Sequence, residues 1–193
     1  MDISSHQEWE GHTFKNLRKT EVDFSAIIFE DCFFEDCEFM GGNLRDASFT
    51  NCSFYSCNLS NLQLINCKFD VVEFIDCKLL GLNFSLCKKL LFSMDIKNGN
   101  VLMCNFSNLD LSNRTLSNTT FKECDFYKTN LSETDLGNSD LQDSLFENCD
   151  MRKADFRNAV NYKIDPNQNR IKQAKFSLPE VLSFLTPLEI DIE

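Results

Sequence analysis

Large apolar residues recur at every fifth position through most of the chain. Thirteen consecutive positions spaced five apart are Phe or Leu: Phe24, Phe29, Phe34, Phe39, Leu44, Phe49, Phe54, Leu59, Leu64, Phe69, Phe74, Leu79 and Phe84. The register fails at Lys89, restarts two residues out of phase at Leu91 and continues to Phe156. A helix has a period of 3.6 residues and a simple strand a period of 2, so neither produces this pattern.

A second inward position lies two residues before each large one. It carries small or apolar residues, and all ten cysteines fall in it when the first register is extended to Lys89. A five-residue lattice is not the spacing of a zinc site, which favours CxxC-like pairs. We therefore expect buried, free thiols that fill space, because free cysteine behaves as a small apolar residue.

The remaining three positions of each repeat are mostly Asn, Asp, Ser, Glu, Lys or Thr, which gives the pattern A(D/N)LXX. Segments such as ADFRN (154–158), TNLSE (129–133) and SDLQD (139–143) resemble the pentapeptide-repeat family as they stand, and the resemblance covers about residues 24–156. It implies an all-β fold, a right-handed quadrilateral parallel β-helix with four five-residue faces per turn. Each turn would then take twenty residues.

Residues twenty apart support this four-sided coil. Phe34, Phe54 and Phe74 would share one column, Phe106, Phe126 and Phe146 another, and Cys37, Cys57 and Cys77 a third. About seven coils at ~4.8 Å each would make a rod of roughly 32 Å. We expect an N-terminal cap over 1–13, in which Trp9 and Phe14 cover the first coil. The β-helix would then span 14–160, and a C-terminal segment 161–193.

Residues 85–91 contain the phase shift. One interpretation is a two-residue bulge between two stacks of coils. The other is a small projecting loop in which Lys88 and Lys89 form a basic spot on an acidic rod.

The C-terminal segment predicts a short helix and a strand. Ser177 and Glu180 have the spacing of a capping box with Pro179 in the first turn, Pro187 would end the helix, and 188–192 alternate like a strand. This apolar surface could cap the last coil. The alternative that we favour is a homodimer, because relatives commonly pair end to end. Its interface would contain Leu178, Val181, Leu182, Leu185 and Ile190.

The sequence offers no catalytic residues. No histidine follows His12, so a Ser-His or Cys-His pair within the rod is excluded, and the nucleotide-binding and zinc-protease motifs are absent. A metal site from His6, His12 and nearby acids is conceivable, but we expect no metal and no cofactor. We predict a binding protein rather than an enzyme.

The net charge of −11 argues against nucleic acid and against anionic membranes as partners. The N-terminus lacks a cationic, then apolar leader pattern, so we expect a cytoplasmic protein. Residues 24–156 have a net charge of −9, about one charge per 3.5 Å of rod, against one per ~1.7 Å for duplex DNA.

The family resemblance implies a role for this acidity. The Qnr, MfpA and McbG members are acidic rods that bind DNA gyrase and topoisomerase IV, and they act as DNA mimics that confer quinolone resistance or toxin immunity. This chain would be a partial mimic; a general protein-interaction scaffold is the alternative. The candidate contact residues are Glu30, Asp31, Glu35 and Asp36 on the first coils and Asp135, Asp140, Asp143 and Glu147 on the last.

Overall fold

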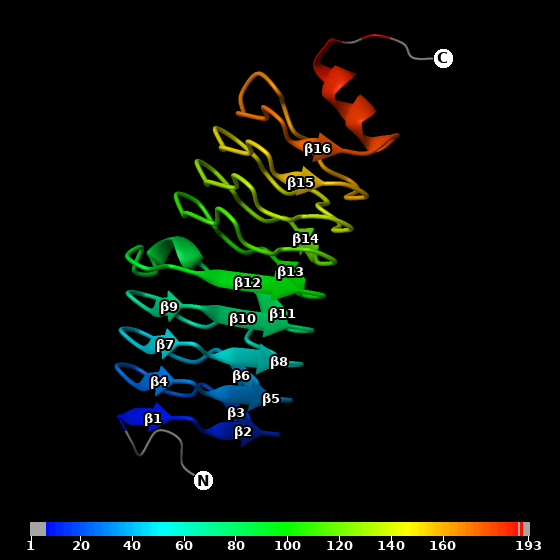
Figure 1. Cartoon of the computed structure of the whole chain (residues 1–193). Coiled ribbons are helices and arrows are strands. Elements are labelled where there is room, and N and C mark those ends of the chain that lie inside the picture. The colour runs from blue at the N-terminus through cyan, green and yellow to red at the C-terminus, as the bar shows by residue number, and fades with distance from the viewer. Residues whose placement is uncertain (1–6, 189, 191–193) are drawn as a thin grey trace.

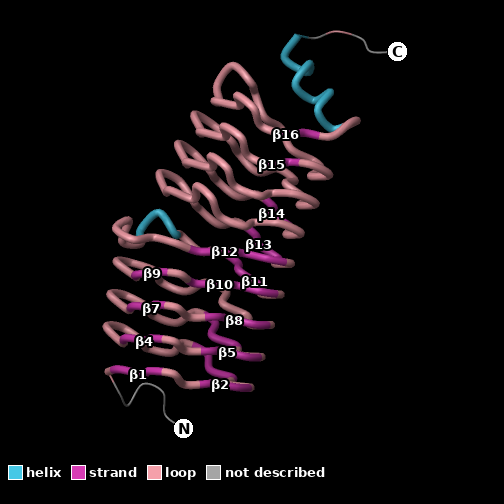
Figure 2. Tube along the Cα trace, viewed as in Figure 1, coloured by secondary structure: helices cyan, strands magenta, loops and turns pink. Residues whose placement is uncertain are grey.

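The computed structural model describes residues 7–188 and residue 190, and these form one continuous coil (Figure 1). The strands are β1 (Glu8–Glu10), β2 (Thr13–Lys15), β3 (Arg18–Thr20), β4 (Ile28–Glu30), β5 (Phe33–Glu35), β6 (Glu38–Met40), β7 (Ser48–Thr50), β8 (Ser53–Tyr55), β9 (Lys68–Asp70), β10 (Val72–Ile75), β11 (Lys78–Leu80), β12 (Met94–Lys97), β13 (Asn100–Leu102), β14 (Thr120–Lys122), β15 (Asp155–Phe156) and β16 (Lys175–Phe176). Two short 3₁₀ helices, η2 (Phe84–Leu86) and η3 (Glu180–Leu188), complete the described part, which contains no α-helix (Figure 2).

The strands stack in columns, and every strand pair is parallel. Face 1 contains β1, β4, β7 and β9, and face 2 contains β2, β5, β8, β10 and β12, with β15 and β16 further along. Face 3 contains β3 and β6, followed by β11, β13 and β14, whereas face 4 is joined through isolated bridges such as Asp23 to Asn43. The chain is thus a right-handed quadrilateral β-helix, as the repeat predicted, and it has about eight turns where about seven were expected.

Stacked phenylalanine rings fill the inside of the coil. Trp9 pairs with Phe29 in register, and Phe14, Phe34 and Phe54 follow one another at offsets of twenty residues. The rings of Phe34 and Phe54 are parallel with centroids 4.5 Å apart, and those of Phe126 and Phe146 are 4.8 Å apart. The spacing equals the separation of paired strands, so one large residue per face and coil fills the core continuously.

The second inward position is also confirmed: all ten cysteines are free and buried. The thiol of Cys77 donates to the carbonyl of Phe54 in the preceding coil at 3.3 Å, and the hydroxyl of Thr134 donates to the carbonyl of Leu111 at 2.7 Å. Small side chains with a donor therefore suit this slot, because they fit beside the large residues and give a buried carbonyl a second hydrogen bond.

The corners of the coil are formed by the residue two places after each large one. These residues have a left-handed backbone conformation, with φ of 52° at Asp31 and at Asp36 and 58° at Asn61. Asn, Asp and Gly tolerate this conformation better than other residues, which explains their abundance at this position.

The phase shift is a two-residue insertion, because Phe74 pairs with Ile96 and Leu79 with Val101. The expectation that Leu91 restarts the inward register is wrong. Leu91 has a corner conformation with φ of 61° and is 62% exposed, whereas the neighbouring Phe92 is buried with its ring 6.4 Å from that of Phe69. Lys88 and Lys89 lie on the surface beside it.

Both ends of the coil extend further than 14–160. Trp9 does not cap the first coil; it occupies the inward position of β1, which is itself a coil strand paired with β4. At the other end β16 pairs with β15, so the repeat geometry continues to Phe176.

The C-terminal helix differs from the prediction in three respects. It is a 3₁₀ helix, it includes Pro187 instead of ending before it, and the Ser177 hydroxyl accepts a hydrogen bond from the Asn158 N–H at 3.2 Å, outside the helix. The strand predicted for 188–192 lies largely outside the described residues.

Candidate partner-binding surfaces

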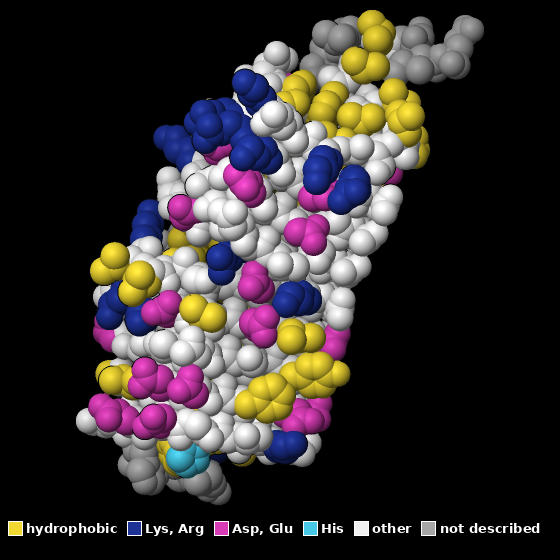
Figure 3. All heavy atoms as spheres, viewed as in Figure 1, with side chains coloured by type: hydrophobic (Ala, Val, Ile, Leu, Met, Phe, Trp, Pro, Cys, Tyr) yellow, Lys and Arg dark blue, Asp and Glu magenta, His cyan; other side chains and the backbone are white. Residues whose placement is uncertain are grey.

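The first two coils carry a dense negative charge. Residues 8–46 contain ten carboxylates and four basic side chains, a net charge of −6. Two coils span roughly 10 Å, which gives about one net charge per 1.6 Å, close to the ~1.7 Å of duplex DNA. Figure 3 shows Asp and Glu side chains gathered near the N-terminal end of the rod. The average over the whole chain hides this local density.

Three of the four predicted carboxylates on these coils are available to a partner. Glu30 ends a strand of face 1, and Asp31 and Asp36 form exposed corners. Their carboxylates form no hydrogen bond or ion pair within the described part of the chain. The fourth, Glu35, is half-buried and paired with Lys15 on the preceding coil. We call Glu30, Asp31 and Asp36 the acidic edge.

The four acidic residues predicted on the last coils do not form one surface. Asp135 precedes an inward residue of face 2, Asp140 one of face 3, and Glu147 follows one of face 4. They therefore point to different sides of the rod. Asp143 is paired with Lys163 at 3.5 Å.

Asp135 and Asp140 also have a structural role. The Asp135 carboxylate accepts a hydrogen bond from the Gly137 N–H at 2.9 Å, and Asp140 accepts one from the Gln142 N–H at 3.2 Å. Asn43 and Asn130 accept the same bond at the equivalent position of other coils. This repeated turn explains the Asp/Asn of the sequence pattern, so part of the rod's acidity reflects folding rather than partner binding.

An apolar cluster on face 2 lies beside the acidic edge and was missed by the sequence reasoning. Phe33 is 36% and Tyr55 41% exposed, and Tyr55 stacks on the half-buried Ile75 of the next coil. Exposed aromatic groups with a charged rim are typical of protein-binding surfaces. The signal was present in the sequence: an aromatic residue occupies an outward position that is otherwise polar.

The segment at the phase shift combines basic and apolar groups. Lys88 and Lys89 are exposed, as is Leu90 at 81%. The predicted basic spot therefore exists on the surface, and it has an apolar neighbour.

The predicted dimer residues are only partly exposed. Leu178, Leu182 and Ile190 face solvent, whereas Val181 and Leu185 are half-buried. The cap of the last coil is instead Phe184, whose ring packs against Phe176 with centroids 4.8 Å apart.

The described residues contain no cluster of three or more His, Cys, Asp or Glu that could bind a metal. His6 lies outside them, and His12 donates from Nδ1 to the carbonyl of Glu10 at 2.7 Å and packs edge-on against Trp9. The described part of the chain also contains no helix of the length and apolar character that crossing a bilayer requires.

A solid rod of stacked parallel coils defines a β-solenoid, which presents its outward side chains on the faces of the rod. A family model for the pentapeptide repeat region matches residues 27–95 and 100–176, and the chain belongs to the pentapeptide-repeat family. No match was found among curated proteins.

Solved structures confirm the fold. A trypsin-treated form of QnrB1, a plasmid-mediated fluoroquinolone resistance protein, superposes with a TM-score of 0.86 at 20% identity, over 97% of this chain and 94% of that one. Full-length QnrB1 superposes with a TM-score of 0.63 at 17% identity, over 95% and 100% of the two chains.

Proposed function

We propose that this protein binds a type II topoisomerase, DNA gyrase or topoisomerase IV, and protects it from a quinolone-type poison or a peptide toxin. The N-terminal coils would occupy part of the basic groove in which the enzyme binds DNA, so the mimicry is partial. The action is non-catalytic, and the protein acts by occupying a surface in the cytoplasm.

The observation that carries the proposal is the charge density of residues 8–46. A net charge of −6 over about 10 Å reproduces the linear charge of duplex DNA along two coils. Residues 115–150 carry the same net charge, but six of their eight carboxylates accept turn hydrogen bonds or form ion pairs, whereas those of the acidic edge do neither within the described residues. The similarity of fold to a fluoroquinolone resistance protein supports the same function.

The apolar cluster of Phe33, Tyr55 and Ile75 supports a second candidate function, a general protein-interaction scaffold. A DNA mimic does not need exposed aromatic groups, whereas protein interfaces use them as anchors. The two functions differ in salt dependence: binding through charge weakens as salt rises, and binding through apolar anchors changes little.

A gyrase supercoiling assay with and without a quinolone, together with direct binding at low salt, tests the proposal. The variant Glu30→Gln with Asp31→Asn and Asp36→Asn removes three charges and keeps residues that tolerate the corner conformation. We expect gyrase binding about tenfold weaker and a loss of protection, because each charge contributes to a screened attraction.

The matched control is Asp140→Asn, Asp143→Asn and Glu147→Gln, which removes the same charge from the last coils and keeps the turn acceptors. It should leave gyrase binding within about twofold. Equal losses for both variants would contradict the assignment to the acidic edge. Absence of binding to either enzyme at low salt would contradict the function itself.

We also propose a homodimer through the C-terminal segment. Leu178, which precedes η3, is 75% exposed, and Leu182 within η3 is 41% exposed, whereas Phe184 of η3 packs against Phe176 of the last coil. An exposed apolar stripe at the end of a rod is suited to a two-fold contact with a second copy.

A further inference from the structure

The last coils reverse the charge of the rod. Residues 151–176 contain seven basic and two acidic residues, a net charge of +5 in a chain whose total is −11. Figure 3 shows Lys and Arg side chains gathered over these coils, at the opposite end from the acidic ones. Six of the seven lie on or between faces 1 and 2. We call Arg152, Lys153, Arg157, Arg170, Lys172 and Lys175 the basic patch.

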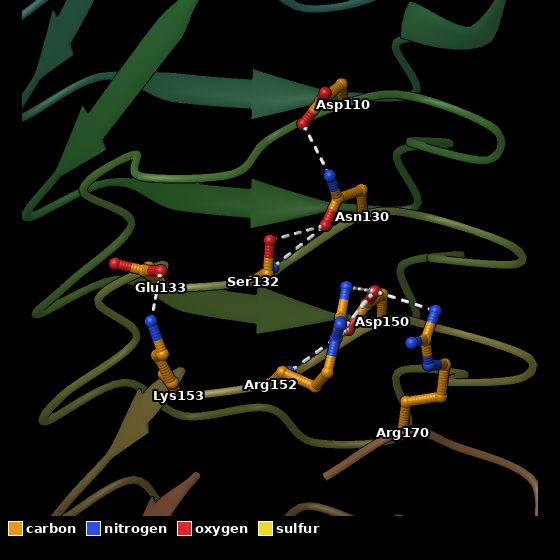
Figure 4. Close-up of polar contacts among 8 residues, drawn as sticks. All are labelled: Asp110, Asn130, Ser132, Glu133, Asp150, Arg152, Lys153 and Arg170. Atoms are coloured by element: carbon orange, nitrogen blue, oxygen red, sulfur yellow. Dashed lines mark hydrogen bonds and ion pairs between the residues drawn. The ribbon is translucent and has the colours of Figure 1, made fainter. Parts of the chain in front are cut away.

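Stacking of successive coils creates this patch. Asp150 pairs with Arg170 across adjacent coils and Asp155 with Lys175, so residues twenty apart in sequence become neighbours. Figure 4 shows Arg152 and Arg170 converging on the carboxylate of Asp150 from two coils. The sequence spreads these residues over 24 positions, and only the coil places them together.

The carboxylates within the patch are too few to neutralise it. Asp150 accepts from Arg152 at 2.6 Å and from Arg170 at 3.2 Å, and it is therefore shared by two guanidinium groups. Asp155 is likewise shared by Arg157 at 2.5 Å and Lys175 at 3.7 Å.

A third carboxylate, Glu133, pairs with Lys153 at 2.9 Å. A fourth, Asp135, pairs with Asp155 in register and lines the same surface as Lys153 and Lys175. Six cations thus face four carboxylates, which leaves a net charge of about +2. Hydrogen bonds from the Arg residues lower the pKa values of Asp150 and Asp155, so both carboxylates are ionised at neutral pH and are included in this count.

Lys172 is the group most available to a ligand. Its ammonium group forms no hydrogen bond or ion pair within the described part of the chain. It lines a shallow depression of about 280 Å³ together with Arg152, Lys153 and Gln173. Ser132 and Glu133 complete the lining, so every side chain around this depression is polar or charged.

The composition of the patch distinguishes between partners. Protein partners are anchored by buried apolar and aromatic groups, and this depression offers none. Single-stranded nucleic acid requires aromatic platforms on which bases stack, and these are missing as well. The phosphate backbone of a duplex is bound through charge and donor groups alone, from Lys, Arg, Ser and Gln.

We propose that the basic patch binds the phosphate backbone of double-stranded DNA without sequence preference. This proposal departs from the expectation, drawn from the net charge, that the protein has no nucleic-acid partner. Other nearby acidic side chains outside the patch lie on or between faces 3 and 4, on the other two sides of the rod: Glu123, Asp125, Asp140, Asp143 and Glu147. The acidic edge lies about 30 Å away along the rod, roughly three Debye lengths at 0.1 M salt. The proposal does not depend on topoisomerase binding, although the two ends together would suit an enzyme that is holding DNA.

The salt dependence follows from the charge. Neutralising about two phosphates gives a slope of log K against log salt of about −1.8, so affinity should fall about 12-fold between 50 and 200 mM salt. Binding of the full-length protein to a fluorescein-labelled 30-base-pair duplex, measured by anisotropy with no topoisomerase present, tests this value.

Two matched substitutions locate the site. Lys172→Ala should weaken binding and reduce the magnitude of the slope by about 1, because one phosphate contact is lost. Lys78→Ala removes the same charge from an exposed position of β11 on face 3 and should change neither quantity. Circular dichroism of both variants checks that the coil is intact.

The proposal is overturned if the duplex does not bind at 50 mM salt, or if both variants weaken binding equally. It is also overturned if a polyglutamate peptide or a single strand of the same length binds more tightly than the duplex. A null result here leaves the topoisomerase proposal standing, since that assay uses the other end of the rod and a different ligand.

Discussion

Replacing Phe54 by Ala should remove a central element of the aromatic column. Phe54 is 3% exposed, and its ring stacks on Phe34 with centroids 4.5 Å apart and on Phe74 at 5.1 Å. It also meets Phe49 of the adjacent face at 5.6 Å. Large-to-small replacements of buried Phe cost about 3–5 kcal/mol, and the amount depends on how far the surroundings can relax into the cavity.

Relaxation is limited at this position. The strand β8 that carries Phe54 is hydrogen-bonded on both sides, to β5 and to β10, so the coils cannot close the gap without breaking their ladders. Lost ring contacts of about 0.5–1.5 kcal/mol each add to the burial term. We therefore expect a loss of about 4–5 kcal/mol, the upper part of the range.

Urea denaturation followed by circular dichroism measures this loss, and the melting temperature should fall by about 10–20 °C. The control is Gln63→Ala, at an exposed outward position of face 4, which should cost less than about 0.5 kcal/mol. A loss below about 1.5 kcal/mol for Phe54→Ala, or equal losses for the two variants, would refute the column as the source of stability.

Two further outcomes test the small slot and the C-terminal surface. The thiols should resist a bulky aromatic disulfide reagent in the native protein, because all ten are buried, and all ten should react after unfolding. Several fast-reacting thiols in the native state would contradict their assignment to the buried small-residue position. Leu178→Glu with Leu182→Glu should convert a dimer to a monomer in light scattering without unfolding it, because both side chains are exposed in the single chain. As a control, Leu145→Glu at an exposed position of face 4 should leave the dimer intact. If the variant with both Leu178→Glu and Leu182→Glu is still a dimer, the dimer contact lies elsewhere.

The inward positions of the coil were predictable residue by residue. Phe34, Phe54 and Phe74 lie twenty residues apart because each fills the same inward position in successive coils. The same constraint on side-chain size therefore acts on the sequence in every coil. The cysteine slot was predictable for the same reason. The hydrogen bonds from this position to a backbone carbonyl, which also favour Ser and Thr there, were not predictable. The sequence does not show which carbonyl lies nearby.

Places where the repeat is interrupted were not predictable. Leu91 and Phe92 are both large and apolar, and the sequence pattern placed the wrong one inside. A two-residue insertion can be accommodated by several backbone paths, and only the packing against Phe69 selects one. The 3₁₀ geometry of η3 likewise lies beyond the last repeat, where no periodic constraint acts.

The amino-acid composition determines the total charge of the chain. Only the tertiary structure determines which parts of the surface are acidic and which are basic. Within the described residues, the carboxylates of Glu30, Asp31 and Asp36 form no ion pair and lie at one end of the rod, whereas Arg152, Arg170 and Lys172 lie close together near the other. Electrostatic interactions are screened within about 10 Å at 0.1 M salt, so a partner responds to the nearest coils and not to the average of −11. Stacking places residues twenty positions apart next to one another at the spacing of paired strands. Charges that are dispersed in the sequence thereby gather into an acidic region on the first coils and a basic patch on the last.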